Sequence, residues 1–323
     1  MPRTPAKKRI AVGSGLILAT LLAFLLAISW GSSGWHWPWT SDSGTRLLIG
    51  ELRLPRAIAA FVTGALLAQA GCLMQVLLRN PLADPYILGL SGGAAAFALI
   101  GLTLGIGTLP VAALAFAGAM LSMVLVFVLA RGRGAWSTTR VLLTGVVVAA
   151  GWGAIISFIL ATGPDASLRS MLYWLMGDLS YAGLSLWWLL IPAGSTVLLA
   201  ARARALNVMT GGQVQAMLLG EPTRIRFWEI YVGASVLTAV AVSIAGAIGF
   251  VGLIVPHLMR LLVGADHRAL LPAATLSGGA FLVIADTAAR SILAPRHLPV
   301  GVLTALIGVP LFLLLLHRAA RIR

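Results

Sequence analysis

The sequence has little charge for its size. Only 10% of its 323 residues are Asp, Glu, Lys or Arg, whereas 59% are apolar and the mean hydropathy is +0.98. A soluble domain carries about 25% charged residues because its surface faces water. This chain cannot coat a soluble surface, which excludes a cytosolic enzyme, a secreted domain and a partner of nucleic acid. We expect most of its surface to contact the lipid bilayer.

Cysteine and lysine are nearly absent as well. The one cysteine, Cys72, excludes an internal disulfide and is expected to be a buried apolar residue. The two lysines, Lys7 and Lys8, both lie in the N-terminal tail. An ATP-hydrolysing P-loop needs G-x-x-x-x-G-K-[ST], so this chain has no Walker lysine. It also lacks H-E-x-x-H and paired C-x-x-C motifs. We expect no catalytic residue, no metal site and no cofactor bound by this chain.

Long apolar runs dominate what is present. A membrane-spanning helix needs about 20 mostly apolar residues. The first run is longer than the apolar part of a signal peptide, roughly 7–15 residues, and leads into Trp30, so we expect it to be retained as a span. The fold class is therefore all-α and polytopic. We predict one transmembrane domain over residues 1–323 with spans at 10–30, 56–78, 86–107, 109–130, 140–162, 183–201, 227–246, 248–263, 270–291 and 299–317.

The basic residues set the orientation. Lys and Arg accumulate in short cytoplasmic loops. If the tail at residues 1–9 is cytoplasmic, all but six of the 23 Lys and Arg residues fall on the inner side. Both termini are therefore predicted to be cytoplasmic. The six outer residues are Arg46, Arg53, Arg56, Arg169, Arg290 and Arg296.

Acidic residues inside spans are few. Ion-coupled transporters commonly place acids in the membrane as relays. Only Glu229 and Asp286 fall within the predicted helices, each near an end, and Arg290 follows Asp286 by four residues, which favours an ion pair. An ion-coupled secondary transporter is thus the weaker alternative to an ATP-driven one. A membrane scaffold without transport conflicts with the polar residues of the second and third spans.

Two stretches carry longer patterns. The first includes residues 52–56, 64–71, 79–85 and 88–94, where small residues allow close helix contacts and Asn-Pro and Asp-Pro enforce turns. The second includes residues 245–257, 264–268, 298–301 and 308–310. In these motifs the chain, from about residue 45 to 317, resembles the permease subunit of type II ATP-binding-cassette importers for iron chelates, haem and vitamin B12.

The resemblance implies an assembly. A homodimer of ten-helix permeases would surround a central path, with spans two to five and seven to ten as packing units of opposite orientation. Two ATPase subunits, which hold ATP and Mg, would lie beneath it, and a periplasmic substrate-binding protein above. The implied location is the bacterial inner membrane.

The resemblance also implies two contact sites. The loop between spans six and seven would form short helices that dock on the ATPase, unless it is a simple amphipathic loop helix; its candidate residues are Asn207, Gly211, Gly212, Leu219, Gly220 and Glu221. On the outer side, Arg53, Arg56 and Arg290 align with arginines that pair with glutamates of the binding protein. The alternative for these arginines is snorkelling to lipid headgroups.

The path and the cargo are less constrained. Asn80, Leu82, Ser137, Thr138 and Thr139 match regions that narrow the path in relatives, although such residues also cap helices. Arg296 and His297 would make the outer opening of the path basic and so favour an anionic cargo, and histidine can ligate iron. We therefore expect an iron chelate, haem first, with a ferric siderophore and vitamin B12 as alternatives. The candidate substrate residues are Arg169, Arg296 and His297.

Overall fold

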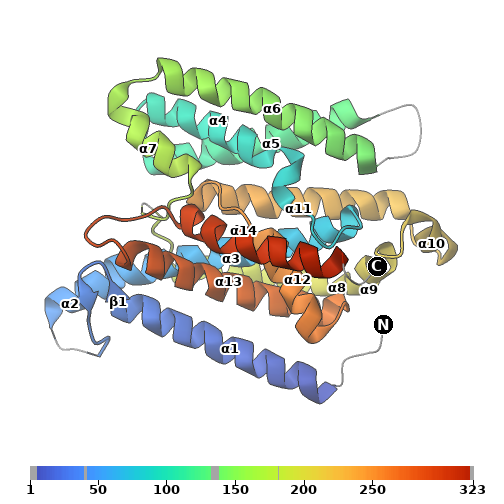
Figure 1. Ribbon diagram of the computed structural model, residues 1–323, viewed down its shortest axis with the longest axis horizontal. Helices are drawn as coiled ribbons and strands as arrows, with labels where there is room; N and C mark the ends of the chain where they lie inside the picture. Colours follow the sequence, from blue (N-terminus) through green and yellow to red (C-terminus); the bar gives the residue numbers. More distant parts are fainter. Residues whose placement is uncertain (1–5, 40–41, 132–137, 181, 321–323) are drawn as a thin grey trace.

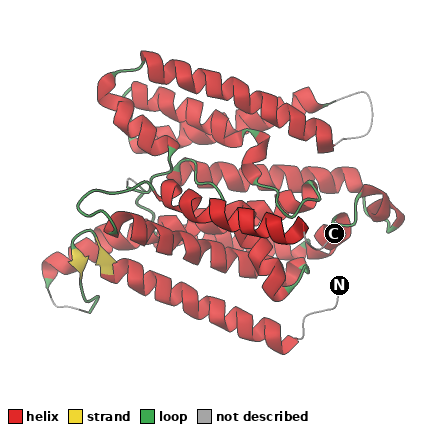
Figure 2. Ribbon diagram, in the orientation of Figure 1, coloured by secondary structure: helices red, strands yellow, loops and turns green. Residues whose placement is uncertain are grey.

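A computed structural model describes residues 6–39, 42–131, 138–180 and 182–320 of the chain. The described part is a helical bundle with a single two-stranded hairpin at one end (Figures 1 and 2). Each predicted span coincides with a helix, which confirms the all-α polytopic prediction. These helices are α1 (Ala6–Ser29), α3 (Leu54–Leu77), α4 (Leu90–Thr103), α5 (Thr108–Ala130), α6 (Thr138–Thr162), α8 (Leu190–Ala201), α11 (Thr223–Ala245), α12 (Val251–Val263), α13 (His267–Ser291) and α14 (Val300–Ala320).

The spans are not equal in length. Seven of the described helices are long and apolar enough to cross a membrane alone. Helices α4 and α12 are shorter. Helix α8 reaches that length only together with α9 (Ala203–Met209), from which it is bent by 64°. Short helices and bends of this kind need protein neighbours, because an isolated segment must cover the whole apolar thickness itself.

The boundaries differ from the sequence prediction in three places. The second span begins earlier, with α2 (Ser43–Leu47) and the π-helix η1 (Leu48–Arg53) running directly into α3. The third begins later, because Pro85 opens a 3-10 turn, η2 (Pro85–Leu88), and Gly89 follows with φ 70°. The sixth begins with a 3-10 turn, η3 (Leu186–Leu189).

Helix α3 is the central element. Its residues from Ala57 to Leu77 are all buried. Small residues allow this, because a Cβ on Gly64 would collide with the carbonyl oxygen of Gly278 in α13. A Cβ on Gly71 would likewise collide with the carbonyl of Gly252 in α12. In lipid, such close backbone approach replaces the hydrophobic effect as the source of helix association.

The two ends of the bundle carry different additions. The start of α1 and the end of α14 lie at the same end as α9 and α10 (Gln213–Leu218) (Figure 1). The opposite end carries α2 and the hairpin formed by β1 (Trp30–Gly31) and β2 (Gly34–Trp35). Helix α7 (Asp165–Leu175) follows α6. We call the end that carries α9 and α10 the inner end, and the end that carries α2 and the hairpin the outer end.

Candidate functional site

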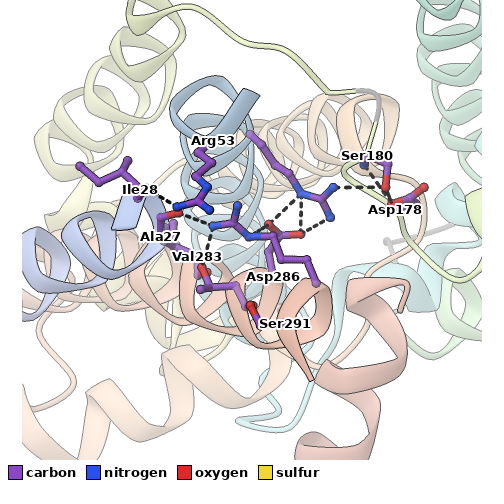
Figure 3. A network of polar contacts seen from close by, with 11 residues as sticks. Ala27, Ile28, Arg53, Asp178, Ser180, Val283, Asp286 and Ser291 are labelled. Atoms are coloured by element: carbon purple, nitrogen blue, oxygen red, sulfur yellow. Dashed lines mark hydrogen bonds and ion pairs between the residues drawn. The ribbon is translucent and has the colours of Figure 1, made fainter. Parts of the chain in front are cut away.

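At the outer end, Arg56 of α3 and Asp286 of α13 form a two-pronged ion pair (Figure 3). Arg56 Nη2 lies 2.8 Å from Asp286 Oδ1, and Nε lies 2.9 Å from Oδ2. Arg56 Nη1 also donates to Ser180 Oγ at 3.2 Å, and Ser180 is held in turn by Asp178. Planar guanidinium and carboxylate groups match in this geometry. The pair joins α3 to α13 and to the segment after α7.

Arg53 and Arg290 belong to the same network and connect it to the end of α1. Arg53 Nη1 donates to the carbonyls of Ile28 and Ser29 at 2.9 and 2.7 Å, where α1 ends. Arg290 Nη2 donates to the carbonyl of Ala27, and its Nε lies 3.8 Å from Asp286 Oδ2, as the spacing of four residues predicted. The other partners of Arg53 are all in the hairpin: Ser33 Oγ, the Gly34 carbonyl and His36 Nδ1.

Burial separates the three arginines that the sequence predicted for docking. Arg53 is 3% exposed and Arg290 6%, whereas the Arg56 side chain is 13% exposed. Arg53 and Arg290 therefore spend their donors on holding α1, the hairpin and α13 together. One carboxylate, Asp286, is shared by Arg56 and Arg290, with Arg53 close by. This cluster carries more positive than negative charge just below the outer surface.

The loop between α8 and α11 forms two short helices, α9 and α10, as predicted for the coupling loop. We call residues 203–221 the coupling segment. Helix α10 turns its apolar side chains outward: Val214 is 70% exposed and Leu218 83%, and Met217 and Leu219 are exposed too. Exposed apolar side chains in a cluster usually mark a contact surface. The coupling segment has the surface that a partner protein would cover.

Two glycines of the coupling segment are required by its backbone. Gly212 has φ 98° and Gly220 φ 80°, values that L-residues rarely adopt. A side chain on Gly212 would also approach Arg79 Nη1. Gly211 lies in the turn between α9 and α10, and Glu221 accepts from Arg226 Nε at 3.0 Å. These residues shape the segment and attach it to α11.

Asn207 differs from the exposed apolar residues of α10. Its side chain points inward and contacts Asp266 and His267, at the start of α13. Burial raises the pKa of Asp266, but hydrogen bonds from Asn207 and from the Arg268 amide, together with Arg9, bring that pKa below its ordinary value. Asp266 therefore remains ionised. Sequence reasoning missed both of these partners because they lie about 60 residues further along the chain.

A polar cluster lies between the helices, about Gln69 of α3. Gln69 Nε2 donates to Thr196 Oγ1 at 2.8 Å, in α8, and to Thr275 Oγ1 at 3.0 Å, in α13. Its Oε1 accepts from Ser195 Oγ at 2.7 Å. A buried amide in a span needs such partners, since lipid offers none. Gln69 therefore has its partners within the bundle.

The predicted path residues lie near the inner end. Asn80 Oδ1 accepts from the Leu82 amide at 2.9 Å, which closes the turn after α3. Thr138 and Thr139 begin α6, and Ser137 lies outside the described residues. Closer to the bundle centre, a Cβ on Gly145 of α6 would approach the Ile87 carbonyl to within 2.5 Å. Asn80 and Leu82 thus lie in a local turn, and α6 packs against η2.

Asp84, next to these residues, is a half-buried carboxylate. It accepts from the Tyr86 amide at 2.8 Å and has no ion pair among the described residues. Burial raises the pKa of Asp84 from 3.8 to about 6. The Tyr86 hydroxyl accepts from the Ile248 amide at 3.1 Å, so this turn also touches the connection between α11 and α12.

Two of the predicted substrate residues, Arg169 and His297, contact Tyr173 at the outer end, His297 through its backbone carbonyl. The guanidinium of Arg169 lies 5.5 Å from the centre of the Tyr173 ring, one turn along α7. The Tyr173 hydroxyl donates to the carbonyl of His297 at 3.3 Å. Arg296 and His297 are both exposed in the segment between α13 and α14. The structure therefore joins two sequence-distant basic segments at one place.

A cavity of about 380 Å³ lies beside α7. Its walls include Tyr173, Trp174 and Trp188, with Asp178 as the acidic group. This volume is at the small end of the range for drug-sized ligands. A macrocycle such as a corrin or a porphyrin exceeds it, so a single copy of this chain does not enclose such a cargo here.

Comparisons with known proteins point to one family. The profile of the FecCD transport family matches residues 16–318. The cobalamin import system permease BtuC of Halobacterium salinarum is 45% identical, over 84% of this chain and 74% of its own length. The vitamin B12 import system permease BtuC of Escherichia coli O157:H7 is 37% identical, over 95% and 93%. A solved inward-facing structure of a metal-chelate type ABC transporter superposes with a TM-score of 0.85 and 29% identity, over 95% of this chain and 99% of that one.

Proposed function

This chain belongs to the FecCD transport family and is the permease subunit of an ATP-binding-cassette importer, and we propose that its cargo is a corrinoid of the vitamin B12 type. The supporting observation is its similarity to two permeases named for cobalamin or vitamin B12, from an archaeon and a bacterium. The prediction of haem has no such support and becomes the second candidate.

We propose that two copies of this chain assemble about the path. The small volume of the cavity beside α7 supports this, because a macrocycle needs walls that a second copy would complete. Two ATPase subunits, which hold ATP and Mg, would cover the exposed apolar face of α10. This chain has no Walker lysine, which supports the assignment of ATP hydrolysis to separate subunits.

We place the protein in the inner membrane with its inner end in the cytoplasm. The positive-inside bias supports this orientation, because the basic residues concentrate at the end that carries α9 and α10. In this orientation the turn at Asn80 and Leu82 and the start of α6 at Thr138 and Thr139, which Ser137 precedes in the sequence, would narrow the cytoplasmic exit.

The outer end would receive the substrate-binding protein. Of the three predicted arginines, only Arg56 has a partly exposed side chain, so we propose it as the direct contact. Arg53 and Arg290 would act through the positive charge that they add beneath the surface. Charge complementarity of this kind guides association and weakens with salt.

The cargo is tested by transport in proteoliposomes. The permease, its ATPase and its binding protein are reconstituted, and uptake of labelled cyanocobalamin, haem and a ferric siderophore is measured with and without ATP. We expect ATP-dependent uptake of cyanocobalamin. Uptake of haem or the siderophore alone would contradict the corrinoid proposal while leaving the importer class intact, and uptake driven by an ion gradient without ATP would overturn the class.

Haem is retained as the second candidate on one observation. Arg169 lies against the Tyr173 ring, and the Tyr173 hydroxyl contacts the backbone of His297, which follows Arg296 in the sequence. Arginine binds carboxylates such as haem propionates, and histidine ligates iron. If haem were the cargo, replacement of Arg169 and Arg296 by glutamine would reduce haem uptake, and unchanged haem uptake would contradict a role for these two residues.

A further inference from the structure

We propose that Asn207, Asp266 and His267 form the joint through which the coupling segment moves α13. The proposal rests on the function proposed above, since it assumes an ATPase beneath the coupling segment. It assigns Asn207 a positioning role, because its side chain faces the permease interior and not the surface that a partner would cover. Asp266 and His267 then become part of the coupling machinery, although they lie outside the coupling segment.

The contact geometry carries the proposal. Asn207 Nδ2 donates to Asp266 Oδ1 at 2.9 Å. Asn207 Oδ1 accepts twice, from the His267 amide at 2.9 Å and from His267 Nδ1 at 2.6 Å. One amide side chain of α9 is thus held by three hydrogen bonds to the first residues of α13.

These bonds also fix the chemical state of the joint. A backbone N–H can only donate, so the atom that faces the His267 amide must be the oxygen of Asn207 and not its nitrogen. The same oxygen accepts from His267 Nδ1, which must therefore carry a proton. His267 Nε2 is buried without a partner among the described residues, as suits the neutral ring.

Burial makes the joint stiff. The whole of His267 is 1% exposed, and Asn207 is half-buried. Asp266 caps α13 by accepting from the Arg268 amide at 3.1 Å and also accepts from Arg9 at 3.4 Å, which attaches the start of α1. Water cannot replace the bonds to His267, so a shift of α9 must either displace α13 or leave buried groups unpaired.

A second attachment joins α13 to α8, the helix on the other side of the bend from α9. Helix α8, which continues into α9 through the 64° bend, reaches α13 through Thr196 and Thr275, both bonded to Gln69. Thr275 lies eight residues after His267, about 12 Å along the helix. Both arms of the bend are therefore hydrogen-bonded to α13, which favours their moving together.

The bend is also tied to α11, but at the surface. Arg202 Nη1 lies 2.8 Å from Glu229 Oε1, and the two side chains are 52% and 39% exposed. Exposed ion pairs contribute little, since water and salt compete for both charges. Arg202 lies close to Asn207 in the sequence, so its substitution provides a matched control.

The consequence reaches the outer end. Helix α13 runs from the joint at His267 to Asp286 and Arg290, which hold Arg56 and α1. A displacement of α13 by the coupling segment would therefore be felt at the surface proposed for the binding protein. Linkage makes the effect reciprocal: a binding protein at the outer end would alter the coupling segment.

The experiment uses the full complex in nanodiscs. ATP hydrolysis is measured with and without the binding protein, supplied both cargo-free and loaded with cyanocobalamin. Asn207→Ala is expected to lose about fivefold or more of the stimulation by the binding protein. Arg202→Ala should keep its stimulation within about twofold of the unmodified protein.

A pair of variants at His267 separates the joint from simple packing. Asparagine can place an N–H donor where Nδ1 lies, whereas leucine has a similar size and no donor. We expect His267→Asn to retain most of the stimulation and His267→Leu to lose it, as Asn207→Ala does. If Asn207→Ala fails to assemble, this pair decides the question.

Three results would count against the proposal. Full stimulation in Asn207→Ala overturns it, and so does equal stimulation in the two His267 variants. An unmodified complex that shows neither stimulation nor ATP-driven uptake overturns the proposed function, and the joint with it. Uptake of a cargo other than cobalamin contradicts only the cargo, because stimulation of hydrolysis does not depend on that choice.

Discussion

The two ends of α13 are fastened by different chemistry. At the outer end, a single carboxylate, Asp286, holds two guanidinium groups, and a third lies nearby. At the inner end, the side-chain amide of Asn207 makes one hydrogen bond to Asp266 and two to His267, one of them to its neutral imidazole. Coulomb attraction falls slowly with distance, whereas hydrogen bonds weaken steeply outside a narrow geometry. The outer end is therefore held by strong and tolerant contacts, and the inner end by contacts that respond to small displacements.

Removal of Asp286 would break the outer fastening and should give the largest effect. Asp286→Ala leaves the guanidinium groups of Arg56 and Arg290 without their carboxylate, and loss of one partner of a buried ion pair costs about 3–5 kcal/mol. We expect a clear fall in the thermal unfolding midpoint of the detergent-purified protein. Glu229→Ala, which breaks only exposed ion pairs, serves as the control. Equal midpoints for the two variants would show that the outer network is not a structural fastening.

Charge reversal at Arg56 sharpens the comparison at the surface. Arg56→Glu should weaken association with the binding protein about tenfold at low ionic strength, because a complementary charge becomes a repulsive one. The difference should shrink at high salt. The measurement is the dissociation constant at two salt concentrations, with Arg46→Glu, an exposed outer arginine, as a charge-matched control. An equal effect of the two substitutions would indicate a general field and no specific role for Arg56.

A smaller effect is expected from Asp84, a carboxylate with no ion pair at the inner end. Its folded-state pKa, about 6, lies above its ordinary 3.8. Between these values the folded protein keeps a proton that the unfolded chain has released, so stability falls as pH rises from about 4 to 6 and stays lower above that. Asp84→Asn removes the ionised form and keeps the acceptor oxygen.

We therefore expect Asp84→Asn to be more stable than the unmodified protein above pH 6, by of order 1 kcal/mol. The advantage should shrink as pH falls towards 4. Thermal unfolding of both proteins across this range measures it. A constant difference at all pH values would contradict a raised pKa for Asp84.

The sequence predicted the spans well because apolar length is a local property. All ten predicted segments are helical, and the short helices α9 and α10 lie where the family pattern placed them. The errors lie at helix starts, where Pro85 and Gly89 delay α4. A hydropathy run does not record such a delay, because a 3-10 turn and an α-helix can have the same composition.

The partners of polar side chains could not be predicted in the same way. Arg290 and Asp286 lie four residues apart, and their pairing follows from helix geometry. Arg56 and Asp286 are 230 residues apart, and nothing in either segment identifies the other. Helix rotation in lipid is set by neighbouring helices. For this reason the sequence indicated exposed docking arginines, whereas the structure buries Arg53 and Arg290.

The lone thiol has a practical consequence. Cys72 lies in α3, fully buried at the centre of the bundle. Maleimide and spin-label reagents should not react with Cys72 while the protein is folded. Cysteines introduced near His267 and near Arg290 could then be labelled without first replacing a native one. The distance between such probes during ATP turnover would record directly how far α13 travels.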